Sequence, residues 1–189
     1  EDIKDLRNYI LTVGSIEYRK NHITLLNAYR LLLSEGKTDL PVLVIVGREG
    51  FLNNMIVYQV ENDPLLKNRV KVFSDVSDDD LDYLYRNCMF TLYPAHYEGW
   101  GLPIAESLMY GKQCICSNTS SMIEIAPNIT RFAHPLKTTE WAENIYDLYS
   151  NKDKLEAETK KVIDEYKGTH WSETAQQLID FIRQYENKE

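Results

Sequence analysis

The sequence predicts an α/β fold in which helices cover both faces of a parallel sheet and a helical tail follows. Short apolar runs of about five residues alternate along the chain with amphipathic stretches of helix length, which is the pattern of parallel strands joined by crossover helices. The runs are apolar without interruption, as expected of strands that are buried on both faces. After residue 138 only helix-length stretches follow, and these form the predicted tail.

Six apolar runs predict the strands, and their order in the sheet follows from the fold class. The runs lie at residues 9–13, 42–46, 70–73, 89–93, 113–116 and 130–133. A doubly wound, Rossmann-like sheet with this alternation has the common strand order 3-2-1-4-5-6. Ligands of such sheets bind at the carboxyl ends of the strands, where the strand order reverses.

Five helices are expected between the strands and three in the tail, because apolar residues recur there at three- and four-residue spacing. Ser77 and the acids after it predict a capped start for one helix, and Pro103 suits the first turn of another. The tail helices begin near Ser, Thr or Asn, with acids in the first turn. The predicted helices are residues 22–34, 52–61, 78–87, 102–110, 122–126, 138–149, 152–166 and 172–185.

The composition limits the class of protein. With 189 residues and no linker rich in Gly, Pro or Ser, the chain is expected to form one domain, 1–189, whose core needs no disulfide or structural metal. Asp and Glu number 29 against 21 Lys and Arg, a net charge of −8, so nucleic acid is not an expected partner. The longest apolar stretch, residues 41–47, is far shorter than the ~20 residues of a membrane helix.

The cysteines and the first residues indicate the compartment. Cys88 stands alone, and Cys114 and Cys116 form a Cys-x-Cys without a second pair or flanking His, so buried reduced thiols are favoured over a zinc site. No signal-like segment opens the sequence, and we expect a cytoplasmic protein. The first residue is Glu rather than Met, which predicts that the chain is a piece of a longer protein.

The first candidate site follows the first predicted strand, in the segment Val-Gly-Ser-Ile-Glu-Tyr-Arg-Lys-Asn at residues 13–21. It places a glycine turn and two adjacent cations, Arg19 and Lys20, at the edge of the sheet where ligands bind. Arg grips phosphate oxygens in a two-pronged fork, and Lys supplies a compact charge on a long stem. The segment therefore predicts a phosphate site; the alternative is a pair of solvated surface cations.

The second candidate site is the segment Tyr-Pro-Ala-His-Tyr-Glu-Gly-Trp-Gly-Leu-Pro-Ile-Ala-Glu at residues 93–106. Two glycines flank Trp100 just before a predicted helix, so bare backbone N–H groups and the positive helix end can face an anion. Glu98 lies in the loop and Glu106 one turn into the helix, where both can border one pocket and accept hydroxyl hydrogens. The alternative for Glu106 is that it only complements the helix N-terminus.

Two other patterns have simpler explanations than a site. Asp78-Asp79-Asp80 contains the Asp-x-Asp spacing of a metal site, but acids that follow Ser77 at the start of an amphipathic helix are better explained by an N-cap. His96 lies two residues before Glu98, where it could act as a general base or only line the pocket.

Together these segments resemble the donor-binding domain of retaining glycosyltransferases of the GT-B architecture, family 4. Residues 98–106, Glu-Gly-Trp-Gly-Leu-Pro-Ile-Ala-Glu, match the Glu-x7-Glu motif of that family. The other matching segments occur in the family's order: residues 13–21, the Val-Ile-Val-Gly strand at 44–47, the Val-Ser-Asp-Asp-Asp-Leu-x-x-Leu-Tyr segment at 76–85, Trp141, and residues 171–175. The resemblance covers nearly all of the chain.

The resemblance implies a nucleotide-sugar site that needs no metal and no other cofactor. Glu98, Lys20 and Arg19 would be the catalytic residues, with Glu98 on hydroxyls of the transferred sugar and the two cations on the diphosphate. Glu106 would accept the ribose hydroxyls. The base would be gripped near residues 47–48 and around residues 73–76, largely by main chain, and His96 would line the pocket rather than act as a general base. The other implied binding residues are Gly14, Ser15, Gly47, Arg48, Val76, Gly99, Trp100, Gly101 and Leu102.

The same resemblance implies what the chain does and what it lacks. Such a domain serves an enzyme that transfers a hexose from a nucleotide-diphospho sugar to a glycan or lipid-linked acceptor, in the synthesis of surface polysaccharide. GDP-mannose is the favoured donor, with UDP- and dTDP-sugars as alternatives. The acceptor, and any contact with the inner face of the membrane, would belong to an N-terminal domain that is absent from this chain. The alternatives are a non-catalytic regulatory or scaffold module and a sugar-nucleotide epimerase.

One position departs from the family pattern. Ser15 stands where many members carry an Arg that binds the diphosphate. The binding of phosphate would then depend on Arg19 and Lys20 alone.

Overall fold

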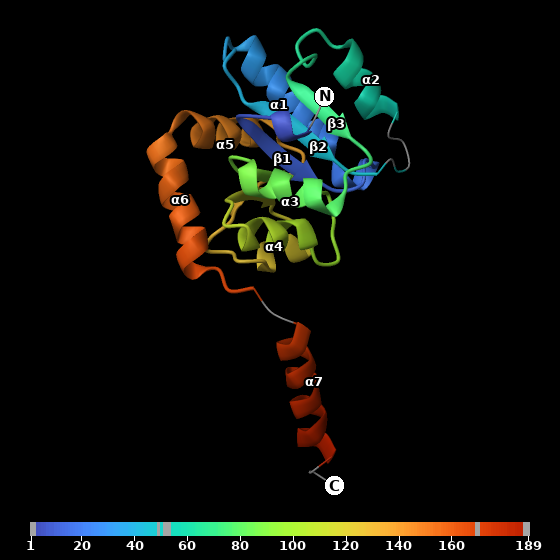
Figure 1. The fold of residues 1–189 in the computed structure, drawn as a ribbon, viewed down its shortest axis with the longest axis vertical. Helices are drawn as coiled ribbons and strands as arrows, with labels where there is room; N and C mark the ends of the chain where they lie inside the picture. The colour runs from blue at the N-terminus through green and yellow to red at the C-terminus, as the bar shows by residue number, and fades with distance from the viewer. Residues whose placement is uncertain (1–2, 49, 51–53, 169–170, 187–189) are drawn as a thin grey trace.

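A computed structural model describes residues 3–48, 50, 54–168 and 171–186. Within these residues, six parallel strands form one sheet in the order β3-β2-β1-β4-β5-β6, with helices packed around it (Figure 1). The strands are β1 (Tyr9–Val13), β2 (Val42–Val46), β3 (Val70–Phe73), β4 (Thr91–Tyr93), β5 (Cys114–Ser117) and β6 (Arg131–Ala133). The α/β, Rossmann-like fold and the predicted strand order are confirmed.

The helices follow the sequence pattern closely. The described ones are α1 (His22–Ser34), α2 (Asn54–Asn62), α3 (Asp78–Asn87), α4 (Leu102–Met109), α5 (Thr138–Ser150), α6 (Lys152–Glu165) and α7 (Trp171–Glu186), with 3-10 turns η1 (Ile3–Asp5), η2 (Tyr18–Lys20) and η3 (Ser120–Glu124). The predicted N-cap of α3 is confirmed, because the Ser77 hydroxyl accepts the N–H of Asp80 at 3.2 Å. Residues 52 and 53, the predicted start of the second helix, lie outside the described residues.

One predicted helix is wrong. The sequence pattern suggests a helix at residues 122–126, but the chain forms the short turn η3 there and leaves the helical conformation at Ile125, which is extended. Ala126 has a φ of 51° and precedes Pro127, and a residue before proline is disfavoured in the α-helical region. The strands β1, β2 and β3 have the predicted bounds, and those of β4, β5 and β6 differ from the predicted ones by one or two residues.

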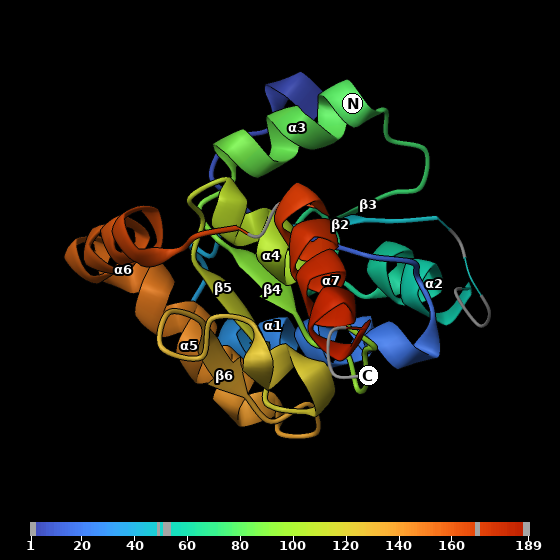
Figure 2. The ribbon, with the colours of Figure 1, turned by 90° about the horizontal axis from the view of Figure 1, so that it is seen from below.

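Both faces of the sheet are buried, because successive side chains of a strand point to opposite faces. Ile10 belongs to the apolar cluster that contains α1 and α5, whereas Leu11 packs with Leu84 and Tyr85 of α3 on the opposite face. Figure 2 shows α1 and α5 on one side of the sheet and α3 and α4 on the other. This double burial explains why the strands are apolar without alternation.

The helical tail is attached to the sheet by a buried side chain and an ionic network. Trp141 of α5 is buried, and its Nε1 donates to the carbonyl of His134 at 3.0 Å. Arg131 of β6 contacts Asp147 of α5 at 2.7 Å and Glu158 of α6 at 2.5 Å. Figure 1 shows α7 extending away from the sheet. Among the described helices, none has both the length and the apolar character required to cross a membrane.

Two glycines let the ends of β1 and β2 meet closely at the carboxyl edge of the sheet. A Cβ atom on Gly47 would lie 1.9 Å from the carbonyl oxygen of Gly14, so a larger residue requires the main chain to move. The N–H of Gly14 donates to the carbonyl of Val46 at 2.9 Å, and that of Gly47 to the carbonyl of Phe73 at 3.0 Å. Main-chain hydrogen bonds, with no side chain between them, therefore connect the ends of β1, β2 and β3.

Candidate functional site

The short turn η2 fixes Arg19 and Lys20 between β1 and α1. Asn21 ends this turn in the left-handed region, at a φ of 56°, which asparagine tolerates better than most residues. Its buried side chain donates to the carbonyl of Pro94 at 2.9 Å. The N–H of His96 donates to the carbonyl of Arg19, also at 2.9 Å. The two predicted site segments, after β1 and after β4, are thus fastened to each other.

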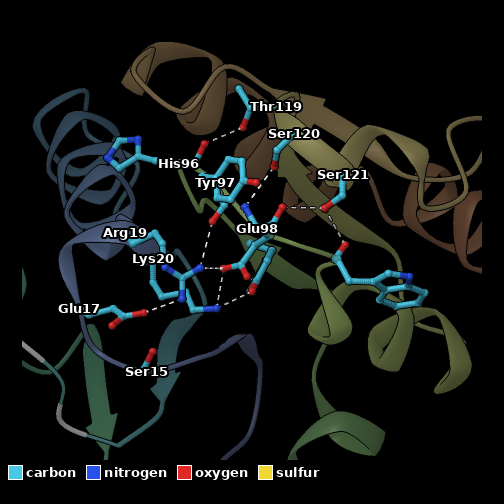
Figure 3. Close-up of polar contacts among 12 residues, drawn as sticks. Ser15, Glu17, Arg19, Lys20, His96, Tyr97, Glu98, Thr119, Ser120 and Ser121 are labelled. Atoms are coloured by element: carbon cyan, nitrogen blue, oxygen red, sulfur yellow. Dashed lines mark hydrogen bonds and ion pairs between the residues drawn. The ribbon is translucent and has the colours of Figure 1, made fainter.

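Arg19, Lys20 and Glu98 meet at this junction (Figure 3). Lys20 Nζ lies 2.6 Å from Glu98 Oε1, and Arg19 Nη1 lies 2.6 Å from the same oxygen. Lys20 also donates to the Tyr93 hydroxyl at 2.8 Å, and Arg19 pairs with Glu17 at 2.8 Å. We call Arg19, Lys20, Tyr93 and Glu98 the Glu98 cluster. Both cations pair with Glu98, a carboxylate that is distant from them in the sequence. They are therefore not two solvated surface cations.

Burial and charge set the protonation of Arg19 and Tyr93 in the Glu98 cluster. The side chains of Lys20 and Glu98 are each 11% exposed, whereas Arg19 is 44% exposed. Burial lowers the pKa of the Arg19 guanidinium, but the carboxylates of Glu98 and Glu17 outweigh burial and raise that pKa above its ordinary value. Burial, and then the charge of Glu98, raise the pKa of the Tyr93 hydroxyl well above its ordinary value. Tyr93 is therefore neutral and can donate or accept a hydrogen bond at neutral pH.

Hydroxyl groups from the segment after β5 hold the loop that carries Glu98. The N–H of Glu98 donates to Ser120 Oγ at 3.1 Å. Ser121 Oγ donates to the carbonyls of Glu98 at 2.9 Å and Trp100 at 3.1 Å. The Thr119 hydroxyl donates to the carbonyl of His96, in the same loop, at 3.0 Å (Figure 3). These contacts were not predicted from the sequence; the available signal was the run of three hydroxyl side chains at residues 119–121, shortly after the predicted strand 113–116.

The predicted anion cradle lies at the start of α4. Gly101 is the N-cap and has a φ of 97°, a conformation that favours glycine. Within the described part of the chain, no acceptor is found for the N–H groups of residues 99–102. Trp100 and Leu102 are 53% and 60% exposed, so their side chains do not close over these groups. The backbone at the start of α4 is free to meet a ligand.

Glu106 has different surroundings from Glu98. Its Oε2 accepts a hydrogen bond from the Tyr85 hydroxyl at 2.9 Å. Burial, and then the charge of Glu106, raise the pKa of Tyr85 well above its ordinary value, so the tyrosine remains a donor. Glu106 lines a hollow between α3 and α4 with Arg86 and Tyr110; Glu98 does not line that hollow. The structure thus gives the two glutamates separate partners.

A second hollow, of about 430 Å³, lies at the carboxyl ends of β1, β2 and β3. The predicted site residues in its lining are Gly14, Ser15, Gly47, Arg48 and Val76. The lining also contains Ser74 and Asp75, which lie within the segment 73–76 expected around the base, although no side-chain role was predicted for them. In the described part of the chain, the side chains of Arg48 and Asp75 have no hydrogen-bond or ion-pair partner. Arg48 and Asp75 therefore place two unpaired charges of opposite sign at the border of this hollow, and the main chain of Gly14 and Gly47 forms its floor.

His96 takes no part in the Glu98 cluster. Its ring packs against Tyr18, with the ring centroids 5.4 Å apart, and Figure 3 shows it directed away from Glu98. Burial lowers the pKa of the His96 imidazole. Its backbone N–H, rather than its ring, connects it to the site.

Comparisons with known proteins identify the family of the chain. A model of the family described as glycosyl transferases group 1 matches residues 1–167. O-antigen chain mannosyltransferase B of Escherichia coli is 29% identical over 174 residues, which cover 92% of this chain and 45% of that protein. The chain therefore spans about half the length of this relative.

Solved structures show the same fold. The C-terminal domain of a glycosyl transferase group 1 family protein, LpcC from Francisella tularensis, superimposes with a TM-score of 0.72 at 18% identity, over 85% of both chains. Anabaena HepE, solved in complex with UDP and glucose, superimposes with a TM-score of 0.69 at 18% identity, over 82% of this chain and 42% of that one.

Proposed function

Because the chain belongs to the glycosyl transferases group 1 family, we propose that it is the donor-binding half of a retaining glycosyltransferase. The whole enzyme transfers a hexose from a nucleotide-diphospho sugar to a glycan or lipid-linked acceptor in surface polysaccharide synthesis. The Escherichia coli relative, named as an O-antigen chain mannosyltransferase, supports mannose as the sugar. The observation that carries the proposal is the convergence of Arg19, Lys20 and Glu98 beside the carboxyl edge of the sheet.

The acceptor is assigned to the part of the enzyme outside this chain. The chain covers 45% of the length of the mannosyltransferase relative, so a second domain of similar size is expected to supply the acceptor site and any contact with the membrane. The three cysteines are free and buried, which supports a cytoplasmic location, where thiols stay reduced.

The donor is placed along the carboxyl edge of the sheet. Arg19 and Lys20 hold the diphosphate together with the unpaired N–H groups of residues 99–102. The base enters the hollow above Gly14 and Gly47. The ribose meets Glu106, and the transferred sugar meets Glu98. Each assignment uses a group whose charge or hydrogen-bonding capacity matches its target.

Charge stabilisation at the diphosphate accounts for catalysis in this scheme. As the anomeric C–O bond breaks, negative charge accumulates on the departing nucleoside diphosphate. Once the diphosphate is bound, Arg19, Lys20 and the helix N-terminus of α4 face that position, so they stabilise the transition state without further reorganisation. No step requires a metal ion or other cofactor.

Asp75 favours guanine as the base. A carboxylate only accepts hydrogen bonds, and guanine presents two adjacent donors on its Watson–Crick edge, whereas uracil and thymine present one donor between two acceptors. Arg48 on the same hollow matches the O6 and N7 acceptors of guanine. GDP-mannose is therefore the proposed donor.

Calorimetric titration with GDP, UDP and dTDP tests this proposal. We expect GDP to bind most tightly, and Asp75→Asn to weaken GDP roughly tenfold or more, since a charged hydrogen-bond partner is lost. Asp79→Asn is the control, because Asp79 is exposed at the start of α3 and does not line the hollow. Tighter binding of UDP than of GDP would exclude guanine, and the failure of all three nucleotides to bind would contradict the assigned function.

A further inference from the structure

A single carboxylate oxygen holds both cations of the site. Glu98 Oε1 lies 2.6 Å from Lys20 Nζ and 2.6 Å from Arg19 Nη1. Among the described residues, no hydrogen bond to Glu98 Oε2 is found. Two cations converging on one anionic oxygen is also how such side chains hold a terminal oxygen of phosphate. Glu98 thus occupies the place that the proposed function gives to the diphosphate.

We propose that Glu98 is the resident counter-ion of the phosphate site and that an incoming diphosphate displaces its carboxylate from Arg19 and Lys20. This inference rests on the proposed function for the identity of the anion. It gives Glu98 two successive positions. The carboxylate first neutralises the cations of the empty site, and after displacement it becomes available to the hydroxyls of the transferred sugar.

The surroundings of Lys20 make the two anions compete. The side chains of Lys20 and Glu98 are each 11% exposed, and the ammonium already donates to Tyr93 and Glu98. A phosphate oxygen added to the same ammonium would lie within about 5 Å of the carboxylate, where two negative charges repel each other strongly in a partly buried site. Diphosphate and carboxylate therefore exclude each other.

The displacement requires a side-chain rotation rather than a loop movement. The N–H of Glu98 is bound to Ser120 and its carbonyl to Ser121. These bonds hold the main chain while the side-chain torsions remain free to change. The carboxylate can leave the cations without disturbing the loop or the N-terminus of α4.

The two positions of Glu98 couple the recognition of phosphate to that of sugar. A nucleoside diphosphate displaces the carboxylate and gives it no new partner. A nucleotide sugar displaces it and offers hydroxyl donors in exchange. The competition should therefore weaken free diphosphates more than intact nucleotide sugars, which favours exchange of a spent nucleotide for a new donor.

Glu98→Gln tests the proposal, because it removes the charge and keeps the shape. Calorimetric titration of this variant is expected to give roughly tenfold tighter binding of both pyrophosphate and GDP than the wild type, with unchanged affinity for guanosine. Glu17→Gln is the graded comparison: among the described residues, Glu17 pairs with Arg19 and not with Lys20, and it is 27% exposed, so we expect a gain below about threefold. Asp164→Asn, which removes the exposed partner of Lys160 within α6, is expected to change nothing.

Unchanged or weaker binding of pyrophosphate by Glu98→Gln would overturn the counter-ion role. If the wild type binds GDP and this variant gains nothing, the counter-ion role fails and the proposed function stands. If no nucleotide binds the wild type but the variant gains affinity for pyrophosphate, the proposed function fails and the counter-ion role stands. Carbon-13 NMR of the Glu98 carboxyl in the wild type gives a second measurement, because pyrophosphate is expected to shift its resonance, and no shift at saturation would also overturn the proposal.

Discussion

Lys20 is the residue on which the affinity for phosphate is expected to depend most. It is the more buried of the two cations and has fixed partners in Tyr93 and Glu98. Lys20→Ala should weaken GDP by about 10- to 100-fold, or ~1.5–3 kcal/mol, because a partly buried charge-assisted bond is lost. Guanosine, which presents no phosphate, should bind as before.

Lys160→Ala is the matched control for Lys20→Ala. Lys160 forms an exposed pair with Asp164 within α6, so its loss should leave the affinity for GDP unchanged. Equal losses of affinity for GDP and guanosine in Lys20→Ala would place Lys20 outside the phosphate site. Both affinities are measured by calorimetric titration.

His22 gives the stability of the fold a dependence on pH. Burial lowers the pKa of its imidazole to about 4, and Nε2 lies 3.2 Å from the carbonyl of Ser15. In the unfolded chain the imidazole titrates near its ordinary pKa of about 6.5. Unfolding therefore takes up a proton as the pH falls below about 6.5, and the folded state loses stability down to about pH 4.

The expected loss is about 2 kcal/mol of unfolding free energy between pH 7 and pH 5. Urea denaturation at the two pH values measures it. His22→Gln keeps a donor for Ser15 and cannot titrate, so the loss in this variant should be smaller by that amount. An identical pH dependence in both proteins would show that His22 is not responsible.

At the scale of the elements, the ends of β1 and β2 depend on their two glycines. Gly47→Ala would place a Cβ atom 1.9 Å from the carbonyl oxygen of Gly14, and backbone cannot yield as a flexible side chain does. We expect a loss of about 2 kcal/mol or more in unfolding free energy. Gly99→Ala is the control, because no atom lies within 4 Å of its Cβ position, and its effect should stay within ~0.5 kcal/mol. Equal unfolding free energies of Gly47→Ala and Gly99→Ala in urea would contradict the close approach of Gly47 to the Gly14 carbonyl.

The elements themselves could largely be predicted from the sequence, for physical reasons. Strands buried on both faces have a strong local signature, and the Ser77 cap marks the start of α3. The helix expected at residues 122–126 is wrong because its apolar pattern was given more weight than Pro127, which ends a helix before it can form a second turn.

The site could be predicted only in part. Motif spacing selected Arg19, Lys20 and Glu98, but the sharing of one carboxylate oxygen between two cations joins residues nearly 80 positions apart and has no local signature. The hydroxyls that hold Glu98 come from a third segment. Asp75 lies in the segment expected around the base, but a role for its side chain was not predicted, because its position on the hollow depends on where β3 ends.

At the scale of the whole molecule, the chain is expected to bind a donor and to transfer nothing. GDP should raise the Tm, because a ligand that binds only the folded state stabilises it by mass action. Millimolar EDTA should leave that shift intact, and no sugar should be transferred from GDP-mannose by the chain alone. Thermal melts measure the shift in Tm, and product analysis shows whether sugar is transferred. A shift that requires a divalent ion would contradict the metal-free scheme, and transfer by the chain alone would contradict the need for a second domain.

The close approach of Gly14 and Gly47 also decides where this chain can be engineered. The floor of the nucleotide hollow is main chain, and at Gly47 there is no space for even a methyl group, so libraries that vary the floor would mostly yield misfolded protein. The rim is different, because Arg48 and Asp75 border the hollow without supporting the core. A search for variants that accept another nucleotide should therefore randomise these two rim positions and leave the glycines untouched.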